Sequence, residues 1–444
     1  MKKLTYLFVM IDGGGNVPPM FGLMKKLLKR GHSVNVLSEP CLEQPIKELG
    51  CGFVPFTDYF TKEDRKEDVL QDHTATLFNN PVFETVMFGP AETVIDQTIE
   101  AAKSLETDVL MVDVLLFPAL MVGEYLNIPK VLVFHMPEYM PGANRPPGNM
   151  GLKPGTGMLT RLRDRLLGKM MVMKFNEFKP KLNRVRTRLG LPPLTDTVDM
   201  MDMADLRIIQ TLRSFDVPIE PAPANVRYTG PVLDDPDWIN GDEWNSPWDA
   251  DDNRPLVVIS FSTTFQNQAE AIQNSINALK NLPVRGLVTL GMAMETEKFD
   301  VPVNVKVVNS VKHSLVFPHA SAVVTHAGHG TIIRAFANGV PLVCMPMGRD
   351  QNDNAIKVEL KGAGIKLSAK AEPRAIKEAV TKVLNDTSYR TNANRMKQEL
   401  AAPLAMEAVL DEMEDWFAEW RKENPEVELQ VTEGPNCEPN KACD

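Results

Sequence analysis

The sequence predicts an α/β fold built from two Rossmann-like, doubly wound domains that face each other across a cleft. A chain of 444 residues is too long for one ordinary hydrophobic core, so two cores are expected. Residues 4–37 have the pattern strand, Gly-rich turn, helix and strand, which opens a parallel βαβ unit. The same alternation begins again at Pro255. Two successive doubly wound halves place the carboxyl ends of two sheets on opposite sides of one cleft.

Composition excludes several classes of protein. The 43% hydrophobic and 24% charged residues are typical of a globular protein. A formal charge of -10 argues against nucleic acid or an anionic membrane as the main partner. The five Cys have no metal-ligand spacing, so we expect no metal site and a reduced, cytoplasmic setting. No stretch is long enough to span a bilayer, and the apolar N-terminus is interpreted as a first strand rather than a signal peptide.

The first half contains six predicted strands, and a helix is expected after the first strand and near residues 91–104. Residues 61–72 are expected to be a solvated helix or loop, and residues 136–157 a long functional loop. A basic, amphipathic helical stretch spans about 158–189, and its Lys and Arg are expected to coat a surface. The predicted strands are Leu4–Ile11, Val34–Leu37, Val109–Asp113, Val131–Phe134, Leu206–Gln210 and Val226–Thr229.

The second half repeats this pattern, and the whole chain divides into five predicted segments. Strands are expected at Leu256–Phe261, Arg285–Leu290, Val305–Val308 and Ala322–Thr325, with a helix at Gln268–Leu279 and helical structure over 389–423. The segments are a domain at 1–229, a linker at 230–254, a domain at 255–403, a C-terminal helix at 404–423 and a disordered tail at 424–444.

The most specific motif is the turn from His326 to Thr331, His-Ala-Gly-His-Gly-Thr, which joins a buried strand to a helix. Backbone N–H groups at such a helix start favour an anion such as a phosphate. One βα unit later, Asp350 and Gln351 provide a carboxylate and an amide, which together suit sugar hydroxyl groups. The alternative interpretation is a structural turn with two capping histidines. If the sheet is doubly wound, both turns lie at the carboxyl ends of neighbouring strands.

These motifs resemble the donor-binding region of family 1 glycosyltransferases, which include macrolide, glycopeptide and glucuronosyl transferases. The N-terminal GGGNVPPMFGLMKKLLKRGHSVNVLS, the turn Phe261–Thr264 and the run Asp350–Ala355 also match that family. The resemblance implies a GT-B fold, a nucleoside-diphosphate sugar bound mainly by the C-terminal half, and a C-terminal helix that crosses back over the first domain. It also implies an acceptor in the N-terminal half, with no catalytic metal or cofactor.

Residue roles are carried over from the resemblance position by position. His326, Gly328 and Thr331 would contact the diphosphate, Ser262 and Thr263 would support it, and Asp350 and Gln351 would hold the sugar. Val311 would pair with the base through its backbone. The expected donor-binding set is Gly14, Ser262, Thr263, Val311, His326, Gly328, His329, Gly330, Thr331, Asp350 and Gln351.

The N-terminal turn departs from the family at its general base, because Asn16 stands where most members carry a histidine. An amide cannot accept a proton near neutral pH. Asn16 is interpreted either as the N-cap of the first helix or as a residue that orients a substrate. Asp113, which matches the family's aspartate partner, is the main candidate for the base, with His73 and His135 as alternatives; the expected catalytic residues are Asn16 and Asp113. An acidic acceptor would reduce the need for a base.

The nucleotide is also left open, because Ser310–His313 replaces the usual base-binding motif and Arg334 stands where plant members carry an acid. The leading hypothesis is an inverting transfer from a UDP- or TDP-sugar to a small, largely apolar acceptor such as a natural product. The protein would act as a monomer or homodimer, without nucleic acid. Asn16 also motivates an alternative, a non-catalytic helper or donor-binding protein. A nicotinamide oxidoreductase is disfavoured because Gly13–Gly15 lacks the required spacing.

Overall fold

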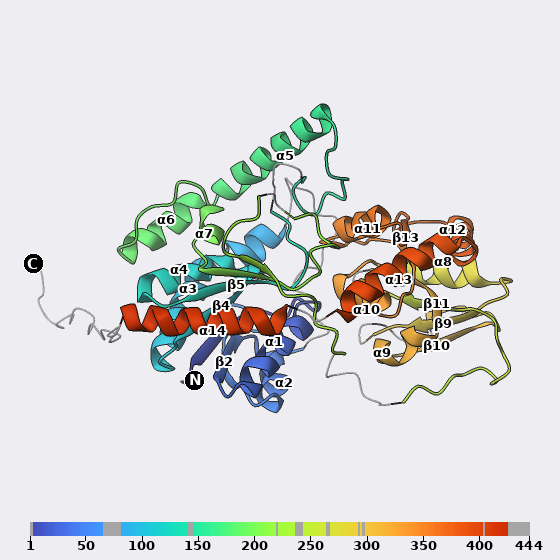
Figure 1. Cartoon of the computed structure of the whole chain (residues 1–444), viewed down its shortest axis with the longest axis horizontal. Coiled ribbons are helices and arrows are strands. Elements are labelled where there is room, and N and C mark those ends of the chain that lie inside the picture. Colours follow the sequence, from blue (N-terminus) through green and yellow to red (C-terminus); the bar gives the residue numbers. More distant parts are fainter. Residues whose placement is uncertain are drawn as a thin grey trace, which may run out of the picture.

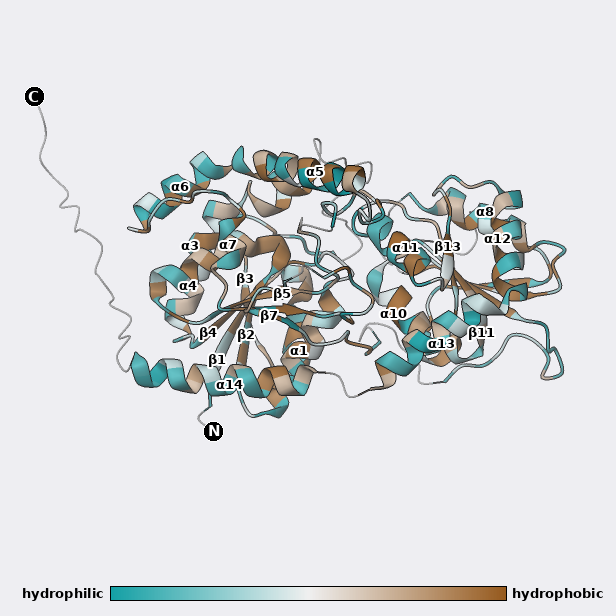
Figure 2. Ribbon diagram, turned by 45° about the horizontal axis from the view of Figure 1, so that its top comes forward, coloured by the Kyte–Doolittle hydropathy of each residue, from teal (hydrophilic) through white to brown (hydrophobic). Residues whose placement is uncertain are grey.

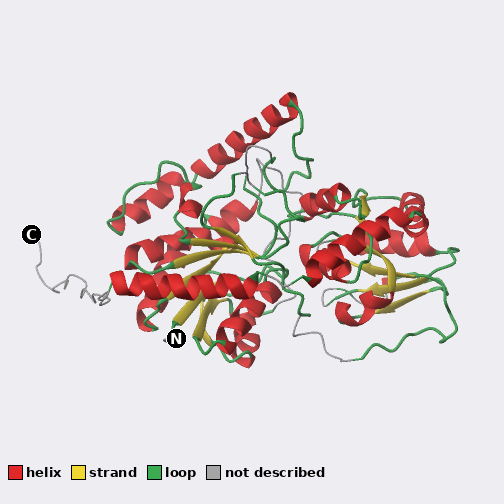
Figure 3. Cartoon of the chain, in the orientation of Figure 1, coloured by secondary structure: helices red, strands yellow, loops and turns green. Residues whose placement is uncertain are grey.

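The computed structural model describes residues 3–64, 81–140, 145–218, 221–235, 243–262, 267–291, 294, 298–402 and 405–424. These residues form two separate parallel β-sheets, each flanked by helices (Figure 1). Figure 3 shows the two groups of strands side by side along the long axis of the molecule, with helices outside them. None of the described helices is long and apolar enough to cross a membrane.

The first sheet has the strand order β3-β2-β1-β4-β5-β6-β7, and all its pairings are parallel. Its central strands are apolar on both faces: Leu7 and Val9 enter one core cluster, and Tyr6 and Phe8 enter the other. This is expected for a parallel sheet covered by helices on both sides. The strands are β1 (Thr5–Val9), β2 (Ser33–Ser38), β3 (Gly52–Pro55), β4 (Val109–Asp113), β5 (Lys130–Phe134), β6 (Leu206–Ile209) and β7 (Val226–Tyr228).

The second sheet has the order β10-β9-β8-β11-β12-β13 and is also fully parallel. Relative to its first strand this is the same winding as in the first sheet, so each half is doubly wound. Two further core clusters cover its faces, one around Val323 and one around Val324. The strands are β8 (Leu256–Ser260), β9 (Arg285–Thr289), β10 (Val305–Val308), β11 (Ala320–Thr325), β12 (Leu342–Cys344) and β13 (Gly364–Lys366).

Helices connect the strands in both halves. Short 3-10 helices include η1 (Pro40–Leu42), η3 (Val114–Ala119) and η5 (Phe317–His319), and η2 (Phe83–Met87) is a π-helix. The α-helices of the first half are α1 (Val17–Lys29), α2 (Glu43–Glu48), α3 (Ala91–Ser104), α4 (Leu120–Leu126), α5 (Met158–Asn176), α6 (Lys179–Arg188) and α7 (Asp199–Asp202). Those that follow are α8 (Ala269–Leu279), α9 (His313–Val316), α10 (His329–Ala337), α11 (Gln351–Leu360), α12 (Pro373–Asn385), α13 (Thr387–Ala401) and α14 (Met406–Glu423).

Helix α14 returns to the first half of the chain and packs on its sheet (Figures 1 and 2). Leu410, Met413 and Phe417 belong to the same core cluster as Tyr6 and Phe8. The ion pairs around this helix include Arg30 with Asp411, at 2.7 Å, and Arg30 with Glu414, at 3.0 Å. Apolar burial therefore fixes α14 to the first sheet, and charged groups surround the contact. The exact boundaries of the five predicted segments stay predictions.

Most predicted strands agree with the structure to within one or two residues, and two long helical stretches are divided. The stretch 158–189 forms α5 and α6, because Pro180 suits the first turn of a new helix but not a helix interior. Likewise, α13 and α14 replace one helical region over 389–423. Strands β3 and β13 were not predicted; none of the four residues of β3 is fully buried, and β13 has only three residues, so their apolar patterns are weak. Residues 65–72 of the predicted solvated segment lie outside the described residues.

Candidate active site

The predicted site residues follow the strands at which each sheet reverses its winding. In the first sheet this switch lies between β1 and β4, and in the second between β8 and β11. Asn16 lies in the turn after β1 and Asp113 ends β4; Ser262 follows β8 and His326 follows β11. Ligands of doubly wound sheets bind in the crevice at such switch points. The fold thus brings together residues that are up to about three hundred positions apart in the sequence.

The side chain of Asn16 is held entirely by its own half of the protein. Its Nδ2 donates to the Ile11 carbonyl at 2.8 Å and to Asp113 Oδ2 at 2.9 Å, and its Oδ1 accepts from the Gly13 N–H at 2.9 Å. Only 1% of the residue is exposed. Asn16 occupies the N-cap position of α1, as one interpretation predicted, but its side chain makes no capping hydrogen bond to the helix. The amide instead closes the turn and ties it to β4, which uses both of its N–H donors.

Asp113 connects this turn to a histidine on the neighbouring strand. It is fully buried, and its Oδ1 accepts from the Leu115 N–H at 2.9 Å. Its Oδ2 lies 3.4 Å from Nδ1 of His135, the residue directly after β5. His135 also lies near the second half of the chain, since its charge affects the pKa values of His329 and Asp350. The carboxylate therefore faces an imidazole that reaches toward the opposite domain.

The turn after β11 brings a buried histidine to the start of α10. His326 is 8% exposed, and a side chain added at Gly328 would place its Cβ 2.5 Å from His326 Nε2. Gly328 is thus needed to leave room for the ring, and Nε2 points at the helix start. Ala327 adopts φ 69°, which a non-glycine residue rarely does, so the turn holds some strain. His329 and Gly330 open the helix, and the N–H groups of a first turn have no partner within the helix.

Three histidines near this turn are held in the neutral form. Burial, and then the nearby Arg349, lower the pKa of His326 to about 4. Burial and the charges of Arg334 and His326 lower the pKa of His313 to about 3. The pKa of His329 is also about 3, mainly through burial and then through His135. Neutral histidines with Arg349 and Arg334 nearby are an environment that a bound anion would suit.

Asp350 and Gln351 lie at the start of α11, after β12. Asp350 Oδ2 accepts from the Asn354 Nδ2 at 2.7 Å, and Gln351 Oε1 accepts from the Met347 N–H at 2.8 Å. Burial raises the pKa of Asp350, although Asn354, His135 and Arg349 oppose the shift. The structure therefore brings Asp350 close to both His135 and Arg349, at the meeting point of the two halves.

The remaining predicted donor residues that the structure describes mostly make local contacts in their own turns or pack at the core. Gly14 adopts φ 80°, which requires glycine, and donates its N–H to Asp12 Oδ1 at 2.9 Å. Ser262 is buried, and its carbonyl accepts from Gln268. Val311 packs at the margin of the second core, and Thr331 donates its N–H to the Gly328 carbonyl. Thr263 lies outside the described residues. His329 shares a 2.9 Å hydrogen bond with the Thr211 hydroxyl, so it contributes to the contact between the two halves.

Further contacts hold the two halves together around the site. Phe215 follows β6 of the first sheet but packs in the second core, against the rings of His329 and Phe336. The carboxylate of Asp353, in α11, accepts from the N–H groups of Asn149 and Gly151 in the loop after β5. The predicted functional loop 136–157 is thereby fixed to the helix that carries Gln351. Its residues 141–144 lie outside the described residues.

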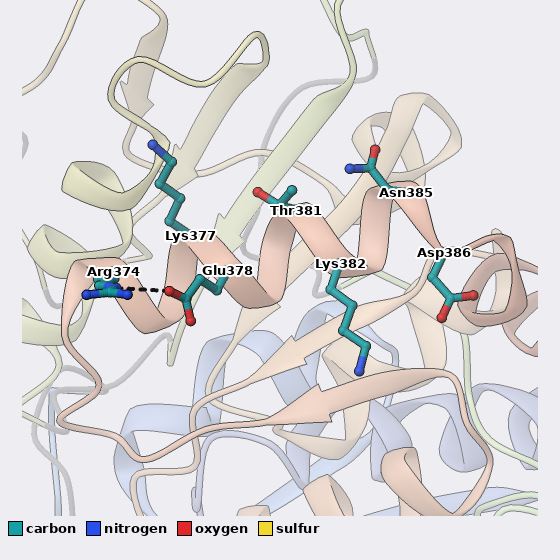
Figure 4. Close-up of a pocket in the computed structure, with 7 residues that line it drawn as sticks. All are labelled: Arg374, Lys377, Glu378, Thr381, Lys382, Asn385 and Asp386. Carbon is teal, nitrogen blue, oxygen red and sulfur yellow. Dashed lines mark hydrogen bonds and ion pairs between the residues drawn. The ribbon is translucent and has the colours of Figure 1, made fainter.

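A surface hollow along α12 is not a candidate for the donor (Figure 4). Its lining comes from one helix and the residue after it, including Arg374, Lys377 and Lys382. Arg374 and Glu378 pair at 3.0 Å, with side chains 90% and 66% exposed. The residues at the two switch points do not contribute to it. Among the described residues, no group of three or more His, Cys, Asp or Glu side chains is placed to hold a metal.

Two doubly wound sheets, each with polar side chains at its switch point, define the class of GT-B glycosyltransferase folds. The chain belongs to the UDP-glucoronosyl and UDP-glucosyl transferase family, whose model matches residues 7–400. It is 28% identical to 4'-demethylrebeccamycin synthase of Lentzea aerocolonigenes over 414 residues, which is 90% of this chain and 97% of that protein.

Solved structures agree with this fold. The calicheamicin glycosyltransferase CalG4 gives a TM-score of 0.74 at 21% identity, over 94% of this chain and 99% of that chain. The glycotransferase of kitacinnamycin gives a TM-score of 0.71 at 20% identity, over 92% of this chain and 98% of that chain. The predicted fold class and family resemblance are confirmed.

Two residues at the site had little or no part in the predicted set. Arg349 directly precedes the Asp350–Gln351 pair and lies near enough to His326 to lower its pKa. Its position next to that pair in the sequence could have indicated that it belongs to the same site. His135 was only an alternative base, because nothing in the sequence indicates that the residue after β5 would face Asp113. The sequence shows only that His135 follows a predicted strand, as Asp113 ends another; it does not show that the two side chains face each other.

Proposed function

We propose that this protein transfers a sugar, with inversion, from a UDP- or TDP-sugar to a small, largely apolar acceptor such as a natural product. The observation that carries the proposal is that polar groups from both halves lie near one another. Asp113 and His135 come from the first half, and His326 and Asp350 come from the second. Membership of the family supports the reaction type. The name of 4'-demethylrebeccamycin synthase supports a natural product as the class of acceptor.

The donor's diphosphate would bind at the start of α10. There the backbone N–H groups of His329 and Gly330, which have no partner within the helix, would oppose its negative charge, together with the ring of His326 and the nearby Arg349. The first turn of α1 is a poorer phosphate site, because Pro18 and Pro19 have no N–H to donate. Asp350 and Gln351 would then accept from and donate to the hydroxyl groups of the sugar.

We assign the general base to His135, with Asp113 as the residue that positions it. With the Nδ1 proton directed to the Asp113 carboxylate, Nε2 carries the free lone pair and accepts the proton of the acceptor hydroxyl. The acceptor oxygen then bonds to the anomeric carbon as the bond to the diphosphate breaks. The electron pair of that bond leaves with the diphosphate. A single displacement of this kind inverts the anomeric centre, and no metal or further cofactor is needed in this scheme.

The test is a turnover assay with a panel of UDP- and TDP-sugars and apolar acceptors, read by mass spectrometry. We expect transfer for at least one pair, and loss of it in His326→Ala. His319→Ala is the matched control, because His319 is exposed at the far end of β11. Normal turnover of His326→Ala would contradict the donor site.

The alternative is a non-catalytic helper or donor-binding protein, and the replacement of the usual histidine by Asn16 motivates it. The two functions differ in one result. A helper would bind a nucleoside diphosphate at the α10 turn but would not transfer sugar to any class of acceptor. An enzyme with a relocated base would transfer sugar with Asn16 unchanged and would lose this activity when His135 is replaced.

A further inference from the structure

Helix α5 exposes a continuous apolar face to solvent. Its inner side is fixed by buried residues such as Met171 and Phe175, while six Leu and Met side chains point outward. At 100° per residue the six fall in a stripe about 120° wide, opposite the buried side. Figure 1 shows α5 rising away from the first sheet. The exposed fractions are Met158 85%, Leu159 79%, Leu162 50%, Leu166 53%, Met170 36% and Met173 69%.

Basic side chains border this stripe on both sides. Arg161 and Arg165 follow one edge, Lys169 lies just inside it, and all three are exposed. Arg163 and Lys174 follow the other edge, where they pair with Asp164, at 2.7 Å, and with Glu177, at 2.6 Å. The single acidic residue of the helix is Asp164, which is buried and accepts from the Gly155 N–H at 2.8 Å. In the described part of the chain no carboxylate pairs with Arg161, Arg165 or Lys169. The edge of the stripe with Arg161, Arg165 and Lys169 is therefore cationic, although the whole chain carries a formal charge of -10.

The distribution of charge indicates what this face can contact. If two copies of α5 packed face to face and antiparallel about a twofold axis, the edge with Arg161 and Arg165 would meet the same edge of the second copy, so repulsion would oppose the contact. An anionic lipid surface satisfies both features, because the apolar stripe enters the acyl boundary while the bordering Arg and Lys reach the headgroups. Figure 2 shows apolar and polar residues interspersed along α5 at the edge of the first half.

We propose that α5 docks the protein on an anionic lipid surface, lying in the plane of the interface. The proposal is independent of sugar transfer. It revises the expectation from composition that an anionic membrane is not a partner, because net charge averages over the chain and hides this local face. The contact needs no spanning segment.

The test is flotation of the full-length protein with vesicles of phosphatidylcholine alone or mixed with phosphatidylglycerol. One variant removes the apolar stripe (Leu162→Gln, Leu166→Gln, Met173→Gln), and a second removes one basic border (Arg161→Gln, Arg165→Gln, Lys169→Gln). All six positions are exposed, so both variants should keep the fold, which circular dichroism and the melting temperature would verify. The matched controls are Val303→Gln and Arg374→Gln, which remove an exposed apolar and an exposed basic side chain elsewhere.

We expect the wild type to float with mixed vesicles but not with phosphatidylcholine alone, and to be released at high salt. Partitioning should fall at least about tenfold in each α5 variant, since each Lys or Arg near the surface contributes about fivefold, and should not change in the controls. Absence of binding to mixed vesicles would overturn the proposal, as would full binding by the apolar variant. A wild-type dimer that the apolar variant converts to a monomer, with no vesicle binding, would assign α5 to self-association instead.

Discussion

The turns after β1 and β11 each follow a strand that borders the switch point of its sheet, but their polar side chains make different contacts. In the first turn Asn16 uses its amide on Gly13, Ile11 and Asp113, all within the same half. In the second turn His326 is uncharged and points at the start of α10, where N–H groups have no partner in the helix. The polar groups of the first turn bind one another, whereas the helix start after the second turn is the site that we propose for the diphosphate. Two turns beside a switch point can therefore differ in whether their polar side chains are used within the fold.

The largest effect is expected at His135, the group to which the closed first turn is connected through Asp113. His135→Gln should lower kcat by about 10²- to 10⁴-fold, the usual contribution of a general base. The affinity for the donor should stay unchanged, because His135 lies on the acceptor side. Steady-state kinetics and calorimetric titration with the nucleoside diphosphate would measure the two quantities, with His319→Gln as the exposed control.

The companion variant Asp113→Asn separates two assignments of the base. If His135 is the base, both variants should lose activity, since the amide no longer fixes the Nδ1 proton of the imidazole. If Asp113→Asn loses activity and His135→Gln does not, the carboxylate itself takes the proton, and our assignment fails.

The second prediction compares a glycine in each turn. In Gly328→Ala the new Cβ would meet His326 Nε2 at 2.5 Å, so the ring must move away from the helix start. We expect donor affinity to fall about a hundredfold, comparable to the loss of two charge-assisted hydrogen bonds. Gly15→Ala is the matched control, because a Cβ there meets nothing within 4 Å and its affinity should stay at the wild-type value. Equal losses in the two variants would remove the distinction between the turns.

The sequence could predict which residues of the two proposed donor turns lie together, but not which residues gather around Asp113, and the reason is the range of the contacts. His326 to Thr331 and Asp350–Gln351 are each contiguous, and a βα turn places contiguous residues by local geometry. The group of Asn16, Asp113 and His135 depends on three strands and on side-chain directions that no local pattern specifies. Asn16 and Asp113, for example, are 97 residues apart. The fold itself was predictable, because fully buried parallel strands appear as apolar runs separated by turns.

The third prediction concerns stability against pH in the second half. His326 has a pKa of about 4 in the folded protein and an ordinary value of 6.5, so the unfolded chain binds a proton first as the pH falls. The stabilisation is present above pH 6.5 and is lost as the pH falls toward 4. It amounts to about 2 kcal/mol between pH 6.5 and 5.

Hydrogen exchange followed by mass spectrometry can measure this loss in each sheet separately. Peptides from β8 and β11 should lose protection between pH 6.5 and 5 after correction for intrinsic exchange rates. His326→Gln should make that dependence shallower, and His319→Gln should not. Loss of protection that is no steeper in the second sheet than in the first would contradict this prediction.

The smallest effect is expected beside the first turn, where a buried acid responds to pH with the opposite sign. Burial raises the pKa of Glu39 to about 7, although Lys62, at 3.7 Å, opposes the shift. The folded protein therefore binds this proton before the unfolded chain does, and its stabilisation is complete below pH 4.5 and is lost as the pH rises through 7.

Glu39→Gln keeps an acceptor for the Asp12 N–H and removes the buried charge. It should raise the free energy of unfolding by about 1 kcal/mol at pH 8, after the lost attraction to Lys62 is offset, and have little effect at pH 5. Urea unfolding of the two proteins at both pH values would measure this, with Glu43→Gln, an exposed acid in α2, as the control. A gain of the same size at pH 5 would show that the charge of Glu39 is not its cause, and the contrast between the two turns would then rest on the histidines alone.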